Sequence, residues 1–68
     1  MKFTKTNALK VLEAEIANKS AIYRDLKSRG EEELAKRYLH EIQGLESAKW
    51  LLTDKKYFED MASIYEVA

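Results

Sequence analysis

A break in the helical pattern at Gly30 constrains the fold of this chain more than any other feature of its sequence. Before Gly30, apolar side chains recur at alternating steps of three and four residues, which is the spacing of one helix face. If that register continued, Glu33 and Arg37 would occupy the apolar face, yet the apolar residues restart at Leu34. The sequence therefore predicts two helices that meet near Gly30 and disfavours one continuous helix.

The residues around Gly30, KSRGEEE at positions 27–33, carry the charges expected at a junction between helices. Lys27 and Arg29 fall in a final helical turn, where the helix dipole favours cations, and glutamates 31–33 fall in a first turn, where it favours anions. Glycine often ends a helix in the left-handed conformation because it has no Cβ. We therefore expect a short connection at positions 29–31, and short connections make neighbouring helices antiparallel.

The remaining helix boundaries follow from capping residues and from a second change of pattern. Thr6 or Asn7 can cap the first helix, and Asp54 can cap a third helix with a new apolar face. Gly44 does not interrupt the second pattern, so we interpret it as an exposed helix glycine. The predicted fold is all-α: an antiparallel helical hairpin (about 7–29 and 31–52) with a short C-terminal third helix (about 54–66), forming a single helical domain over residues 1–68.

The chain is so short that one hydrophobic core is marginal, and we therefore expect self-association. It has 68 residues, no cysteine for a disulfide, and one histidine, which is too few ligands for a structural zinc site. The apolar residues of each long helix spread over an arc of about 160°, wider than the roughly 100° needed to face one neighbour. The third helix can cover part of this surplus, and a second copy of the chain can cover the rest as a homodimer.

Charge divides the chain into a basic half and an acidic half. Residues 1–30 hold seven cationic and three anionic side chains (net +4), and residues 31–68 hold five and nine (net −4), so the formal net charge is zero. An antiparallel hairpin places the two halves side by side. Each exposed ion pair contributes little stability, but the separation disfavours parallel arrangements and favours head-to-tail pairing with a second copy.

Large side chains on either side of the second helix boundary form the candidate interface. Aromatic residues dominate small cores and the centres of protein interfaces, because each one buries a large area. We interpret them as core and interface anchors rather than as the lining of a ligand pocket. The candidate interface residues are Trp50, Tyr57, Phe58, Met61 and Tyr65.

No combination of residues in the sequence matches a catalytic, metal or cofactor site. The helical neighbours of His40 include no carboxylate, so we interpret it as an exposed helix residue. Glutamates 31–33 are consecutive in a helix and do not converge on one ion. The two glycines are too far apart for a phosphate-binding loop, and no serine has the context of a nucleophile. We expect no enzyme activity, no cofactor and no bound metal.

An alternative role, binding nucleic acid, depends on cations in the first half of the chain. A basic helix face can bind phosphates by displacing their counterions. The candidate contacts are Lys19, Arg24, Lys27 and Arg29. The chain is neutral overall and its acidic half lies nearby, so nucleic-acid binding is the weaker alternative.

These observations favour a small helical protein–protein interaction module: an adaptor, assembly factor or inhibitor that acts through exposed apolar helix faces. The expected partners are a second copy of the chain and another protein. No membrane contact is expected, because no apolar stretch approaches the roughly 18 residues of a membrane span. Without cysteine or a targeting signal, the expected location is the cytoplasm. The size and the lack of catalytic groups suggest a small accessory protein of a microbe or virus.

Overall fold

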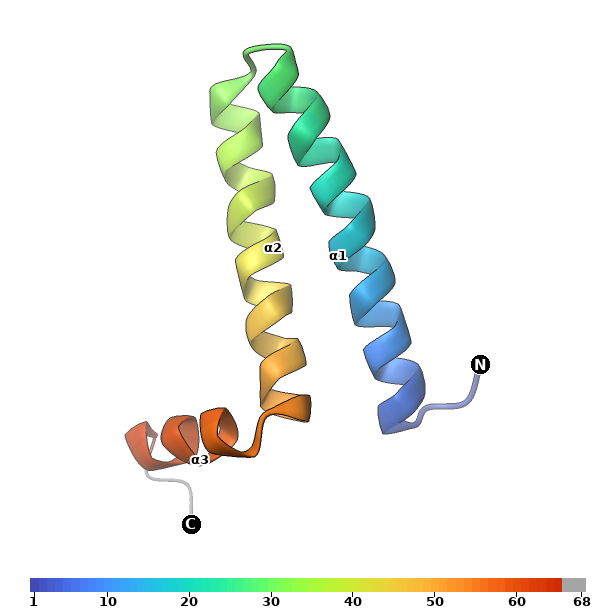
Figure 1. The fold of residues 1–68 in the computed structure, drawn as a ribbon, viewed down its shortest axis with the longest axis vertical. Coiled ribbons are helices and arrows are strands. Elements are labelled where there is room, and N and C mark those ends of the chain that lie inside the picture. The colour runs from blue at the N-terminus through green and yellow to red at the C-terminus, as the bar shows by residue number, and fades with distance from the viewer. Residues whose placement is uncertain (66–68) are drawn as a thin grey trace.

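Three helices make up most of the described chain, as the sequence predicts. The computed structural model describes residues 1–65, and Figure 1 shows its helices α1 (Lys5–Ser28), α2 (Glu32–Thr53) and α3 (Lys55–Ile64). α1 and α2 form the predicted antiparallel hairpin, and α3 is the predicted short third helix. Position 66, at the predicted end of the third helix, lies outside the described residues.

Gly30 closes the hairpin in the conformation that the sequence predicts. Its φ of 74° lies in the left-handed region, where a side chain would strain the backbone. The amide of Glu31 donates to the carbonyl oxygen of Leu26 (2.9 Å), and the amide of Gly30 donates to the carbonyl oxygen of Lys27 (3.1 Å). These two bonds form the Schellman pattern, which satisfies carbonyl groups that the end of α1 would otherwise leave unpaired.

The helix caps agree with the sequence at α3 and differ from it at α1. Asp54 accepts a hydrogen bond from the amide of Tyr57 (3.1 Å), so it is the predicted cap of α3. The cap of α1 is Thr4 rather than Thr6 or Asn7, because Thr4 has an extended backbone and its hydroxyl accepts from the amide of Asn7 (3.1 Å). The helix therefore begins earlier than expected, and the lead segment before it is correspondingly short.

The interior of the hairpin is thin. Ala35 (1% exposed) and Ile42 (6% exposed) are the buried apolar side chains among residues 1–65, and their spacing of two turns places them on one face of α2. The facing side of α1 is only half-buried, at Ala8, Leu12, Ile16, Ile22, Tyr23 and Leu26. Two helices alone cannot enclose a larger core, because each covers only one side of the other.

Lys19 lies on the otherwise apolar face of α1 that packs against α2. Its Nζ donates to Oε2 of Glu41 on α2 (3.0 Å) and lies 5.6 Å from the centre of the Tyr38 ring. A second ion pair joins Lys49 of α2 to Glu13 of α1 (3.8 Å). Both ion pairs join α1 to α2. They fit the antiparallel arrangement, because Lys19, the later residue of α1, pairs with Glu41, the earlier residue of α2, and Glu13 pairs with Lys49.

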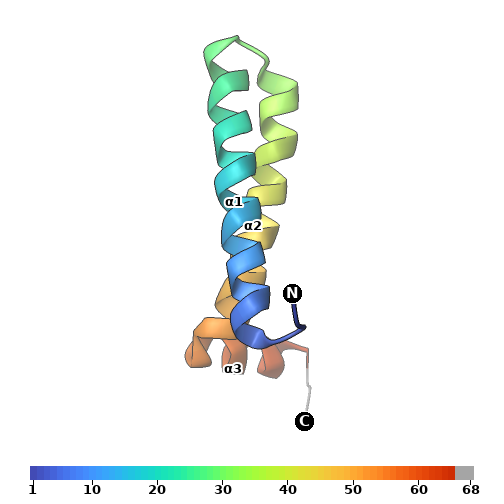
Figure 2. The same ribbon diagram turned by 90° about the vertical axis from the view of Figure 1, so that its right-hand side faces the viewer.

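α3 turns away from the hairpin and, within residues 1–65, packs against α2 but not against α1 (Figures 1 and 2). The expected covering of the hairpin by α3 is therefore confined to the end of α2. The radius of gyration is 14.7 Å, against about 11 Å for a compact domain of this length. The accessible surface is 5528 Å², against about 4,400 Å² for a compact protein of this mass. The single chain thus leaves far more surface exposed than a compact protein of its size.

Candidate docking site at the junction of α2 and α3

The junction between α2 and α3 is short and held by hydrogen bonds on both sides. The amide of Asp54 donates to the carbonyl oxygen of Trp50 (2.8 Å), while its carboxylate caps α3. The hydroxyl of Thr53 donates to the carbonyl oxygen of Lys49 (2.8 Å). Across the junction, the rings of Trp50 and Tyr57 meet edge to face, with centroids 5.8 Å apart and planes inclined by 75°. These contacts fix the direction in which α3 leaves α2.

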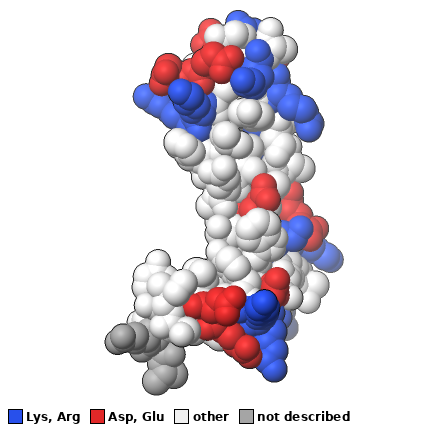
Figure 3. All heavy atoms as spheres, turned by 60° about the vertical axis from the view of Figure 1, so that its left-hand side comes forward, with Lys and Arg blue, Asp and Glu red and all other residues white. Residues whose placement is uncertain are grey.

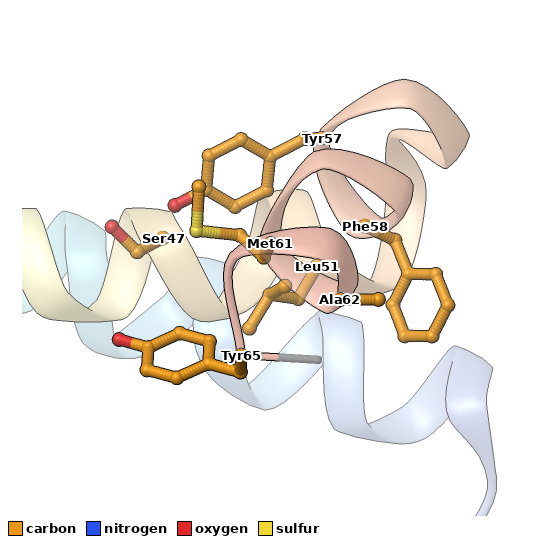
Figure 4. Close-up of a pocket in the computed structure, with 7 residues that line it drawn as sticks. All are labelled: Ser47, Leu51, Tyr57, Phe58, Met61, Ala62 and Tyr65. Atoms are coloured by element: carbon orange, nitrogen blue, oxygen red, sulfur yellow. The ribbon is translucent and has the colours of Figure 1, made fainter. Parts of the chain in front are cut away.

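α2 and α3 meet at an angle and form an apolar groove of ≈ 470 Å³ between them, which we call the elbow groove. Figure 4 shows Leu51 near its centre, with Tyr57, Met61 and Tyr65 to one side and Phe58 to the other. The complete lining consists of Ser47 and Leu51 from α2, and Tyr57, Phe58, Met61, Ala62 and Tyr65 from α3 and its last turn. The groove is therefore built by two helices at a short, hydrogen-bonded junction rather than by loops.

The lining of the elbow groove is open to solvent to an unusual degree for large apolar side chains. Phe58 is 54% exposed and Tyr65 is 75% exposed, and Leu51 is also exposed. Ile64 adds a further exposed apolar side chain on α3 next to the groove. Figure 3 shows an uncharged surface at the lower left of the molecule, bordered by a cluster of charged side chains, with further charged side chains midway along the hairpin and near its turn. Contiguous exposed apolar surface of this kind is typical of interaction sites.

The chemistry of the groove suits binding to an apolar or aromatic surface. Its lining holds no charged side chain, and its polar side-chain groups are the hydroxyls of Ser47, Tyr57 and Tyr65. A hydroxyl can orient a ligand through one hydrogen bond, but these three bring no acid–base or nucleophile–base pair together. Within residues 1–65, no three His, Cys, Asp or Glu side chains gather closely enough to hold a metal ion.

Four of the five residues predicted for the interface line the elbow groove. Trp50, the fifth, lies outside the lining but supports it through its contact with Tyr57. The sequence reasoning missed Ser47, Leu51 and Ala62. The signal for Leu51 was present, because it lies on the polar side of α2, one turn beyond Ser47, where an apolar residue has no packing partner within the helix pair. Ala62 and Ser47 are small, and their role follows only from the angle of α3.

The basic residues of α1 that could contact nucleic acid are largely engaged with carboxylates. Lys19 pairs with Glu41, and Lys27 with Glu32 on α2 (3.1 Å). Arg29 pairs with Asp25 (3.2 Å). The hydrogen bond that Lys27 donates to the Glu32 carboxylate raises the pKa of Lys27 above its ordinary value, which favours the paired cation further. Of the four candidates, Arg24 alone has no ion-pair partner among residues 1–65.

His40 is exposed on α2, as its sequence context predicts. A second, smaller apolar patch surrounds the start of α1, where Met1, Phe3 and Val11 are exposed beside a hollow of ≈ 380 Å³. It differs from the elbow groove because it is formed by one helix and its lead segment, without a second helix to fix its shape. The elbow groove is therefore the better-defined of the two sites.

No protein-family model, curated protein sequence or solved structure matches this chain. No helix in the described part of the chain has the length and apolar character needed to cross a bilayer.

Proposed function

We propose that this protein is a helical interaction module that binds an apolar helix of a protein partner in the elbow groove. The observation that carries the proposal is the exposure of Phe58, Tyr65 and Leu51 around one groove at a joint fixed by hydrogen bonds. A partner helix would bury these side chains without requiring α2 or α3 to move. Binding of an amphipathic helix in an apolar groove is a common mode of protein recognition.

The composition of the groove supports a protein partner over a small molecule or an ion. Aromatic anchors near the centre of an interface contribute most of its binding energy, and Tyr57, Phe58 and Tyr65 supply three such anchors. A charged ligand would be desolvated in the groove without an opposite charge to compensate, at a cost of several kcal/mol. Phe58, Tyr65 and Leu51 are exposed around the groove, so it is open to solvent rather than enclosed, which suits an elongated helix.

Site-specific photocrosslinking tests this proposal directly. A photoreactive phenylalanine analogue replaces Phe58 in one variant and Ala21 in a matched control; Ala21 is exposed on α1 and lies outside the groove. On illumination in an extract of the native cells, position 58 should give discrete crosslinked protein species, whereas position 21 should give none. If position 58 crosslinks no more than position 21, the groove is not a protein-binding site.

Nucleic-acid binding by the basic side of α1 is the second candidate function, supported by the net charge of +4 on residues 1–30. Its weakness is the pairing of Lys19, Lys27 and Arg29 with carboxylates, because a phosphate would have to displace each one. Fluorescence anisotropy with labelled single- and double-stranded oligonucleotides tests it. Binding that weakens steeply with salt and is lost in Arg24→Ala would support this function, and no binding at low salt would remove it.

A further inference from the structure

We infer that the helix that fills the elbow groove is α3 of a second copy of this chain, so that two chains form a symmetric dimer through antiparallel α3 helices. This inference rests on the proposed function, because it names the occupant of the same groove. In a two-fold dimer one surface meets itself, so α3, which lines the groove together with α2, must also supply side chains that fill the groove of the other copy. Phe58 and Ile64 meet this requirement: both lie on α3 and both are exposed in the single chain.

The excess surface of the single chain is large enough to accommodate a dimer interface of standard size. The accessible surface of 5528 Å² exceeds the value for a compact protein of this mass by about 1,100 Å². A stable interface of standard size buries about 800 Å² on each partner. A second copy therefore removes an amount of surface close to the excess, whereas an isolated short peptide helix would leave much of it exposed.

The order of charges along α3 favours an antiparallel pair. Lys55 and Lys56 lie in its first turn, and Glu59 and Asp60 lie one turn later. When two such helices cross antiparallel between Tyr57 and Phe58, the cationic turn of each copy faces the acidic turn of the other. On the helical wheel, Lys55 shares a flank with Glu59, and Lys56 shares the opposite flank with Asp60, so the opposite charges meet along both edges of the interface.

A parallel pair would place like charges opposite each other on both edges. Within one chain, the Lys55–Glu59 pair is long (3.8 Å), and the lysine side chain is almost fully exposed, so these charges remain available to a partner. The antiparallel register also places the end of α3, with Tyr65, near the junction of the second copy, where Trp50 and Leu51 are exposed. Apolar and charged contacts thus favour the same arrangement.

A charge-exchange experiment tests the inference with two variants of the full chain. The acidic variant is Lys55→Glu with Lys56→Glu, and the basic variant is Glu59→Lys with Asp60→Lys. All four side chains are exposed, and glutamates in the first turn of α3 suit the helix dipole, so the variants should keep their helices by circular dichroism. Their association is measured by sedimentation equilibrium, alone and as an equimolar mixture.

The unmodified chain should sediment as a dimer, each variant alone should associate at least about tenfold more weakly, and the mixture should form a one-to-one dimer. Restoration in the mixture would establish that the acidic and basic turns of two copies face each other. If both variants associate like the unmodified chain, or if the mixture stays monomeric, the antiparallel α3 pair is wrong. A monomeric unmodified chain that crosslinks from position 58 to a different protein would overturn this inference and leave the proposed function intact.

Discussion

The two ends of α2 differ in how much apolar side-chain surface they leave exposed. At the hairpin turn, Gly30 closes the chain through paired backbone groups, and Lys27 and Arg29 each meet a carboxylate. Ala35, near this end, is almost fully buried. At the other end, the junction with α3 is equally well hydrogen-bonded, yet the apolar side chains around it stay exposed, with Phe58 at 54%. Backbone hydrogen bonds define both junctions, but more large apolar side chains are exposed around the junction with α3 than near the hairpin turn, where Leu34 is exposed.

A junction can therefore have a well-defined backbone structure while the apolar side chains around it remain exposed to solvent. The hairpin turn is held by hydrogen bonds and ion pairs among its own residues. Residues 1–65 leave the elbow groove exposed, which is costly because about 25 cal/mol of stabilisation is lost for each Å² of apolar surface that remains in solvent. Substitutions inside the hairpin should therefore act mainly on folding, and substitutions in the elbow groove mainly on association.

Removing the centre of the hairpin interior should have the largest effect on folding. Ile42→Ala should lower the free energy of unfolding by about 3 kcal/mol, because Ile42 is 6% exposed and the change leaves a cavity. The measurement is a urea titration followed by circular dichroism. Val11→Ala is the matched control; Val11 is about half exposed, and its truncation should cost less than about 1 kcal/mol. Equal losses in both variants would mean that the hairpin has no centre at Ile42.

Removing an anchor of the elbow groove should weaken association more than folding. Phe58→Ala should raise the dissociation constant of the dimer about 30-fold, or about 2 kcal/mol, which is the effect of a central aromatic anchor. The unfolding of the monomer at high dilution should change little, because this side chain is already more than half exposed. Phe3→Ala is the control, since Phe3 is fully exposed and lies outside the groove. A variant at Phe58 that associates normally would contradict the elbow interface.

Removing the side-chain cap of α3 at Asp54 should affect association, whereas removing the cap of α1 at Thr4 should not. Asp54→Ala should cost about 1 kcal/mol of stability, because the amide of Tyr57 loses its acceptor, and should also weaken association by disturbing α3. Thr4→Ala removes the equivalent cap of α1 at a similar cost but should leave association unchanged. Sedimentation equilibrium of the two variants, beside their unfolding curves, makes the comparison. Equal association would mean that the orientation of α3 does not matter.

The smallest expected effect concerns the ion pair inside the hairpin and depends on pH. The hydrogen bond to Glu41 raises the pKa of Lys19 above its ordinary value of 10.5, so folding favours the charged lysine. Its stabilisation is therefore complete below pH 10.5 and is lost as the pH rises through the folded-state pKa. The unfolding free energies of the unmodified chain and of Lys19→Met should differ below pH 10.5 and converge once the pH exceeds the raised folded-state pKa of Lys19. Lys36→Met, at an exposed position on α2, controls for general alkaline destabilisation.

Much of the fold follows from the sequence because its determinants are local. The phase break at Gly30, the charges around it and the cap at Asp54 each act within a few residues, and all three appear in the structure. The sequence places the cap of α1 at Thr6 or Asn7 rather than Thr4, because each of these three side chains can accept a hydrogen bond from a nearby amide of the first turn. Local competition of this kind decides a boundary by small energy differences, which the pattern of residues alone does not contain.

The candidate site was less accessible to sequence reasoning because it depends on the angle between two helices. Periodicity identifies the apolar face of α3 and hence Tyr57, Phe58, Met61 and Tyr65. It does not reveal that α3 turns outward, so that Leu51 on the outer side of α2 joins the groove. The expectation that α3 would cover the hairpin treated the junction as a fold-back. The contacts around Asp54 direct it away instead.

Sedimentation equilibrium of the unmodified chain, from one to several hundred micromolar, tests the central claim most directly. A dimer closed through the elbow groove predicts a mass of twice 7.9 kDa at tens of micromolar, falling towards 7.9 kDa on dilution. A mass of 7.9 kDa that stays constant across the whole range would show that the exposed side of the elbow has no second copy to cover it.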